Sequence, residues 1–115
     1  MLVFWASWCG PCLAQVPHER ELVARMKGKP FVLVGVNGDD DRAKARNAMK
    51  KYGMTWRSIW NGGEGADGPI TRAWNVRAWP MVYVLDAKGT IRSRGVHGER
   101  LDQAVDDLIH QMEKK

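Results

Sequence analysis

The chain has 115 residues, of which 44% are apolar and 27% charged, and its 18 Lys and Arg against 13 Asp and Glu give a formal net charge of +5. This length suits one compact domain, and the composition excludes a disordered chain. Two cysteines are too few for a disulfide-rich scaffold or a cysteine-only zinc site. No run approaches the roughly 18 apolar residues of a membrane helix. Basic and acidic residues are interspersed, so the charge does not indicate a nucleic-acid partner.

Strands and helices alternate in the first half of the predicted structure. Residues 1–5 form an apolar run typical of a buried strand. A helix follows a short turn, and Pro17 should kink it because proline removes one backbone hydrogen bond. Residues 31–36 form a second buried strand, after which Asp39–Asp41 can cap a helix that Gly53 ends. This βαβα order requires parallel strands joined by a right-handed crossover.

An irregular segment, residues 54–75, is predicted as an insertion. It contains a short strand over 56–60, a glycine-rich loop over 61–68 and a short helix that Pro69 opens. The loop lacks the lysine and the Ser or Thr of a phosphate-binding loop, so we interpret it as a mobile connection.

The chain closes with a predicted hairpin and an amphipathic helix. Strands over 81–85 and 90–94 are joined by a turn, and apolar residues from Leu101 to Met112 recur at steps of three and four. The pattern predicts a single α/β domain over 1–115, with a mixed β-sheet flanked by helices. Because the chain begins directly in an apparent central strand, we interpret it as an excised or N-terminally truncated domain.

Two cysteines, Cys9 and Cys12, lie where the first strand meets the first helix. Free backbone N–H groups and the dipole at a helix N-terminus favour a thiolate at Cys9, so its pKa should fall below the ordinary value of about 8.5. Cys12 lies one turn further along and can reach back to the first sulfur. The pair therefore predicts disulfide exchange, in which Cys9 attacks and Cys12 resolves the mixed disulfide.

A zinc site and an inert structural pair are the alternatives for these cysteines. Zinc needs two more ligands, and His18, His97 and His110 do not have metal-ligand spacing. A disulfide across so short a loop removes little entropy from the unfolded chain, which argues against a stabilising role. We interpret His18, about two helical turns from the pair, as a surface residue.

Two motifs resemble known sequences. Residues 4–12, FWASWCGPC, resemble the active-site segment of the thioredoxin superfamily, and residues 13–17, LAQVP, resemble its branch of membrane-linked bacterial thiol-disulfide reductases related to TlpA and ResA. Residues 76–91 resemble the part of that family with a cis-proline, a hairpin and an Asp-x-x-Gly-x-Ile turn. With both motifs in the right order, the sequence is identified as a member of this superfamily.

The resemblance implies a thioredoxin-like three-layer fold in the order βαβα, insertion, ββα, and a protein-disulfide oxidoreductase that reduces or isomerises disulfides. It makes Cys9 the nucleophile and Cys12 the resolving thiol. It also implies that Pro80 is cis and faces the cysteines, and that the backbone of Trp79 pairs with the substrate chain. The residues that it assigns to supporting the active site are Trp8, stacked beside the sulfurs, Gly10, Pro11 and Pro80.

Partners and location are further implications of the resemblance. Substrates are protein or peptide thiols and disulfides, and an upstream electron donor restores the dithiol. No cofactor or metal is implied beyond the redox-active Cys9–Cys12 disulfide, and neither nucleic acid nor a membrane span in this chain is expected. The implied location is extracytoplasmic, in a bacterial periplasm or cell envelope, with a membrane-anchored parent protein.

The sequence departs from the family at the positions tied to proton transfer. The branch often has a glutamate three residues after the second cysteine, and thioredoxin has an aspartate in the preceding strand. Here these positions hold Gln15 and Val3, neither of which titrates. Trp79 is bulkier than the family's usual residue before the proline. A second hypothesis therefore stays open, a redox-linked interaction module that docks through Trp79 and the glycine loop, with slow or no turnover.

Overall fold

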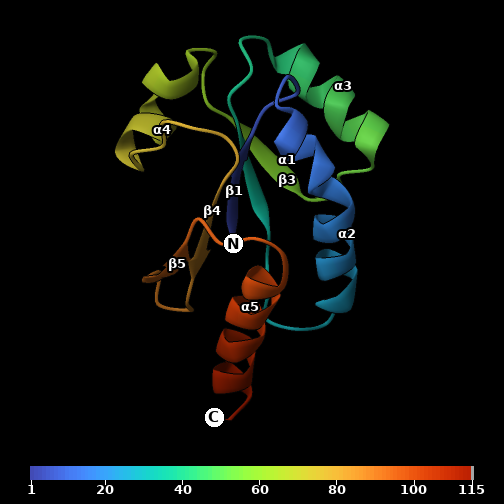
Figure 1. Cartoon of the computed structure of the whole chain (residues 1–115), viewed down its shortest axis with the longest axis vertical. Coiled ribbons are helices and arrows are strands. Elements are labelled where there is room, and N and C mark those ends of the chain that lie inside the picture. Colours follow the sequence, from blue (N-terminus) through green and yellow to red (C-terminus); the bar gives the residue numbers. More distant parts are fainter. Residues whose placement is uncertain (115) are drawn as a thin grey trace.

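Five strands form one mixed sheet in the computed structural model, which describes residues 1–114 (Figure 1). The strand order is β3-β2-β1-β4-β5, and the strands are β1 Leu2–Trp5, β2 Val34–Asn37, β3 Arg57–Trp60, β4 Met81–Leu85 and β5 Ile91–Arg94. β1, β2 and β3 are parallel to one another, whereas β4 is antiparallel to both of its neighbours. β1 is therefore central, and the segment that follows it leaves from the middle of the sheet.

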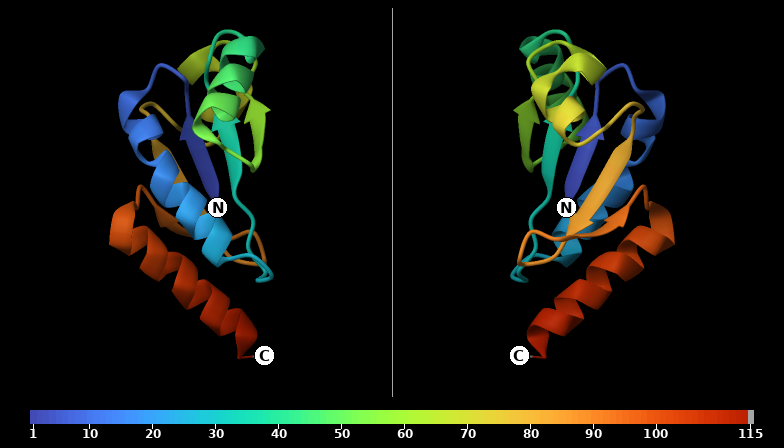
Figure 2. Two further views of the ribbon diagram at one scale, coloured as in Figure 1. Left: turned by 90° about the vertical axis from the view of Figure 1, so that its right-hand side faces the viewer. Right: turned by 90° about the vertical axis from the view of Figure 1, so that its left-hand side faces the viewer.

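Helices cover both faces of this sheet. They are α1 Gly10–Ala14, α2 Val16–Arg25, α3 Arg42–Tyr52, the 3-10 turn η1 Gly65–Asp67, α4 Pro69–Ala73 and α5 Gly98–Glu113. Figure 2 shows α1, α2 and α5 on one face and α4 on the other. A mixed sheet between helices is the three-layer arrangement expected from the sequence.

The sheet separates two hydrophobic clusters because side chains alternate along each strand. Val3 and Trp5 of β1 belong to the larger cluster, to which α1, α2, α3 and α5 also contribute. Phe4 points the other way and packs with Val36, Tyr83 and residues of α4 and the segment after it. β1 is thus buried on both faces, as its continuous apolar run predicts.

The helix after the cysteines is interrupted rather than simply kinked. Gln15 ends α1 and precedes α2, so Pro17 falls in the first turn of α2, where its missing N–H is not needed. The predicted caps of the next helix are confirmed. Asp41 accepts the N–H of Ala43 at the start of α3, and Gly53 ends that helix with a left-handed φ of 66°.

Residues 54–75 contain β3, η1 and α4, and β3 pairs with β2 as an edge strand. The glycine-rich loop is organised around the buried Asn61. This side chain donates to the carbonyl of Gly65 and to Oγ1 of Thr71, and it accepts the N–H of Ile70. Where the sequence suggested a mobile connection, the structure shows a loop tied to a buried amide.

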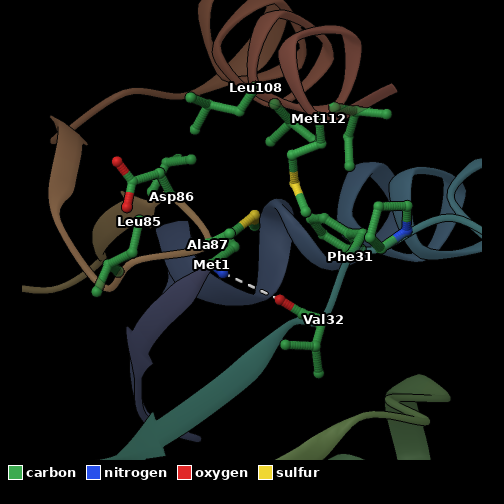
Figure 3. A pocket seen from close by; sticks show the side chains of 12 residues that line it. Met1, Phe31, Val32, Leu85, Asp86, Ala87, Leu108 and Met112 are labelled. Atoms are coloured by element: carbon green, nitrogen blue, oxygen red, sulfur yellow. Dashed lines mark hydrogen bonds between the residues drawn. The ribbon is translucent and has the colours of Figure 1, made fainter. Parts of the chain in front are cut away.

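An apolar groove lies at the end of β1 opposite to the cysteines (Figure 3). Met1, Phe31, Leu85 and Met112 help to line it, and the amino group of Met1 donates to the carbonyl of Val32 at 2.9 Å. Neither cysteine lines this groove, so the groove is separate from the redox pair. Across residues 1–114, no helix has both the length and the apolar character needed to cross a membrane.

Candidate active site

Cys9 and Cys12 meet at the carboxyl end of β1, where they form a disulfide. A tight turn leads into it, because the N–H of Cys9 donates to the carbonyl of Ala6 at 3.1 Å. Cys9 is the N-cap of α1, and its Sγ accepts the N–H of Cys12 at 3.2 Å. Pro11 follows in the first turn, where no N–H is required. The local sequence therefore fixes Cys9 at a helix start with a donor directed at its sulfur.

The disulfide is covered by the chain that carries it. Cys9 and Cys12 are 5% and 4% exposed, whereas Gly10 and Pro11 between them are exposed. The exposed turn between the two cysteines is therefore the part of the pair that faces solvent.

The second motif lies beside the first. The Trp79–Pro80 peptide bond is cis and immediately precedes β4, the antiparallel neighbour of β1. The indole of Trp79 packs edge-on against that of Trp8, with ring centroids 5.5 Å apart. Two segments some seventy residues apart in the sequence are thereby joined at one surface.

Trp8 is more exposed than its expected role of shielding the sulfurs suggests. Its side chain packs on Trp79 and is 61% exposed. Trp5, by contrast, is buried, and its Nε1 donates to Oγ of Ser58 across β2. Of these two tryptophans, only Trp8 offers an aromatic surface to a partner.

Neither position expected to hold a proton acceptor does so. Val3 is a buried core residue, and Gln15 forms the junction between α1 and α2. His18 is turned toward α5, where its Nε2 lies 2.9 Å from Oδ1 of Asp102. Among residues 1–114, no three His, Cys, Asp or Glu side chains are grouped in a way that suits a metal ion.

Glu19 is a buried acid that the sequence analysis missed. It is 3% exposed, and this burial raises its pKa to about 7, while the neighbouring His18 acts in the opposite direction. Its spacing from Cys12 and Val16, both buried, places all three on the inner face of the helices. That spacing is the signal in the sequence.

Asp39 is the second residue missed. It is completely buried just beyond β2, and its carboxylate accepts both the N–H and the hydroxyl of Ser7, at 2.9 and 2.6 Å. A third hydrogen bond comes from the side chain of Asn37 at 2.7 Å. The sequence suggested Asp39 only as one of three helix caps, and it contains no signal for a partner 32 residues away.

Comparison with protein families matches residues 1–109 to the family described as Redoxin. The thiol-disulfide oxidoreductase ResA of Bacillus thuringiensis is 25% identical over 109 residues, an alignment that covers 94% of this chain and 60% of the relative. A thiol:disulfide interchange protein DsbE homolog of Paracoccus denitrificans is 32% identical over 93 residues, covering 79% of this chain and 46% of the relative.

Solved structures agree with these relatives. A thiol-disulfide oxidoreductase from Bacteroides fragilis superposes with a TM-score of 0.86 at 27% identity, covering 93% of this chain and 78% of the other. The chain spans about 60% of the length of the first curated relatives. Because the family match covers nearly the whole chain, the chain belongs to the Redoxin family, as a ResA-like protein of the thioredoxin superfamily.

Proposed function

We propose that this chain is a thiol-disulfide oxidoreductase that exchanges disulfides with protein substrates through Cys9 and Cys12. The observation that carries this proposal is the position of Cys9 as the N-cap of α1, with its Sγ accepting the N–H of Cys12. A donor already directed at this sulfur favours negative charge on it in the reduced protein. Cys9 is then the attacking thiolate.

Reduction of a substrate follows from two exchanges of sulfur bonds. The Cys9 thiolate attacks one sulfur of the substrate disulfide, forming a Cys9–substrate bond and releasing the other substrate sulfur as a thiolate. Cys12, after losing its proton, attacks Sγ of Cys9. The bond between Cys9 and the substrate breaks, and the second substrate sulfur departs as a thiolate. The Cys9–Cys12 dithiol has then lost two electrons to the substrate and become a disulfide. The same steps in reverse oxidise a dithiol.

The proton of Cys12 passes to water or to a departing thiolate in this mechanism, because Gln15 and Val3 do not titrate. In this proposal substrates approach as extended segments beside the cis-proline and pair with the backbone of Trp79; the cis bond before Pro80 and the exposed ring of Trp8 support this path. An upstream donor of electrons must restore the dithiol after each reduction. We place the protein in an extracytoplasmic compartment, where a disulfide persists more readily than in a reducing cytosol.

Single replacements of the two cysteines test this proposal. Cys9→Ser should abolish reduction of a model protein disulfide, because no attacking thiolate remains. Cys12→Ser should retain attack but lose resolution, so that a mixed disulfide with one half of a disulfide-linked peptide substrate accumulates and is released by dithiothreitol. Mass spectrometry detects the adduct. Full activity of the Cys9→Ser protein, or failure of the Cys12→Ser protein to form any adduct, contradicts the assigned roles.

A redox-linked interaction module is the second candidate, favoured by the absence of a titrating group at Gln15 and Val3. In that function the dithiol anchors or senses a partner without cycling. Steady-state measurement with excess disulfide and a thiol reductant that restores the dithiol, corrected for the rate with the reductant alone, separates the two. Many turnovers per chain exclude the module, whereas a single stoichiometric reaction supports it.

A further inference from the structure

The carboxylate of Asp39 is fully buried, and neutral donors satisfy it. Oδ2 accepts the backbone N–H of Ser7 and the side-chain amide of Asn37, and Oδ1 accepts the hydroxyl of Ser7. Burying a charged carboxyl is costly unless it is hydrogen-bonded, and three donors offset that cost. The cost of burying the Asp39 carboxylate points to a role for this residue beyond packing.

Ser7 is the residue through which Asp39 reaches the active site. It lies inside the turn that the Cys9 N–H to Ala6 carbonyl bond closes. Since both donors of Ser7 point at Asp39, this turn is clamped to the end of β2. Two residues later the chain presents Cys9 as the N-cap of α1.

The same short segment also contacts the cis-proline side of the site. Gly38 lies against the indole of Trp79, and its N–H donates to the carbonyl of Trp5 at 2.9 Å. The carbonyl of Asp39 accepts Nε1 of Trp60 at 2.8 Å. Residues 37–39 are therefore anchored independently of Ser7. The hydrogen bonds between Asp39 and Ser7, which we call the clamp, thus hold the turn to a segment that is itself fixed.

We propose that Asp39 is a positioning residue of the active site. By binding both donors of Ser7, it holds the turn that places Cys9 as the N-cap of α1, and it thereby sets the reactivity of the Cys9 thiolate. The inference rests on the proposed function in taking Cys9 as the attacking thiol. Asp39 acts through Ser7 and the backbone, without contact with the substrate.

Asparagine is the conservative replacement for Asp39, because it can form the same hydrogen bonds. An asparagine at position 39 can present its oxygen to the N–H of Ser7 and to Asn37, and its NH₂ to the Ser7 hydroxyl, which accepts as well as donates. Asp39→Asn thus keeps the hydrogen-bond pattern without the charge. Asp39→Ala removes the pattern, and Ser7→Ala removes only the hydroxyl bond.

Alkylation of Cys9 tests the inference in the full-length reduced chain, with Cys12→Ser as a common background so that Cys9 is the lone thiol. The rate with iodoacetamide is measured against pH, and its midpoint gives the Cys9 pKa. Asp39→Ala should raise this midpoint by about one unit, toward that of a free cysteine, and slow alkylation at neutral pH about tenfold. Ser7→Ala should shift it in the same direction by less, and Asp39→Asn should stay close to the parent.

Asp41→Ala is the matched control, because it removes a helix cap two residues away without touching Ser7. It should lower the melting temperature and leave the midpoint unchanged. An Asp39→Ala protein that melts early but keeps the parent midpoint overturns the inference, as does an Asp39→Asn protein that shifts as far as Asp39→Ala. If Asp39→Ala does not fold, Ser7→Ala decides, since an unchanged midpoint there also overturns it.

The alkylation needs no protein substrate, so the two proposals fail separately. A parent chain that reduces no disulfide contradicts the proposed function while the midpoints still test the clamp. An active parent with unchanged midpoints in the variants contradicts the clamp alone.

Discussion

Glu19 illustrates how the burial of one side chain couples stability to pH. It lies on the inner face of α2, where its neighbours along the helix, Val16 and Leu22, are core residues. Desolvation disfavours its charged form and raises its pKa from 4.5 to about 7, with His18 opposing the shift. The folded state therefore binds this proton more tightly than the unfolded chain.

Replacing this acid should change the pH dependence of stability. Between pH 4.5 and 7 the unfolded chain loses the proton and the folded protein keeps it, so stability falls as pH rises and then levels off above about 7. The pKa shift corresponds to a loss of about 3 kcal/mol at most in the free energy of unfolding. Glu19→Gln cannot titrate, so relative to this variant the parent should lose up to that amount between pH 4 and pH 8.

Urea unfolding of both proteins at several pH values measures this difference. Parallel pH profiles for the two proteins would contradict the expected role of Glu19.

The residues of the site that the sequence predicted are those whose chemistry is local. Cys9 and Cys12 lie on one turn of chain, and Pro80 belongs to a recognisable motif. The role of Asp39 depends on a hydrogen-bond partner, Ser7, in the loop after a different strand. No spacing along the sequence reveals this contact. The spacing of Glu19 from the buried Cys12 and Val16 is a signal for its burial, but the interruption of the helix at Gln15 weakens that signal.

At the level of elements, the end of β2 and the cis-proline segment are fitted to each other. A Cβ atom at Gly38 would lie 3.1 to 3.3 Å from three atoms of the Trp79 ring, closer than most real contacts. Packing alone holds this ring, because its Nε1 is buried with no hydrogen-bond partner among the described residues. The absence of a side chain at Gly38 is thus what admits a tryptophan before Pro80.

Gly38→Ala should therefore destabilise the protein by about 1–3 kcal/mol through overpacking. The same change should cost less in a Trp79→Leu background, since leucine lacks the ring atoms that the new methyl group meets. Denaturation of the parent, both single variants and the double variant gives the coupling energy, expected to be about 1 kcal/mol or more. Additive effects would show that the two residues do not constrain each other.

Element type was predictable where apolar periodicity or a cap is strong, as in α3 and α5. The order of the strands across the sheet was not predictable from these signals. β3 is an edge strand whose residues are exposed or half-buried, so its sequence carries little information about which strand it joins. β3 pairs with β2 because α3, which connects the two strands, packs on the sheet. Ala45 and Ala48 are the buried residues of α3 in this contact.

On the scale of the whole molecule, α1, which Cys9 caps, and the C-terminal end of α5 lie far apart along the long axis (Figure 1). One continuous hydrophobic cluster nevertheless joins α1, α2, α3 and α5 to the sheet. Ion pairs between α2 and α5, such as Arg25 with Asp106, add little because they are largely exposed. We therefore expect the chain to unfold as a single cooperative domain.

Ile109→Ala tests this expectation at the end of the molecule away from the cysteines. Ile109 is 6% exposed within the large cluster, and truncating it should cost about 2–5 kcal/mol. Tryptophans occur in both clusters, so fluorescence and far-UV circular dichroism should report one shared, shifted transition. Gln111→Ala, an exposed change on the same helix, should leave stability within about 0.5 kcal/mol of the parent.

The alkylation midpoint of Cys9 should not move in either variant, because its clamp through Ser7 and Asp39 does not involve α5. Separate transitions would indicate two folding units, and a shifted midpoint would show that α5 acts on the redox site.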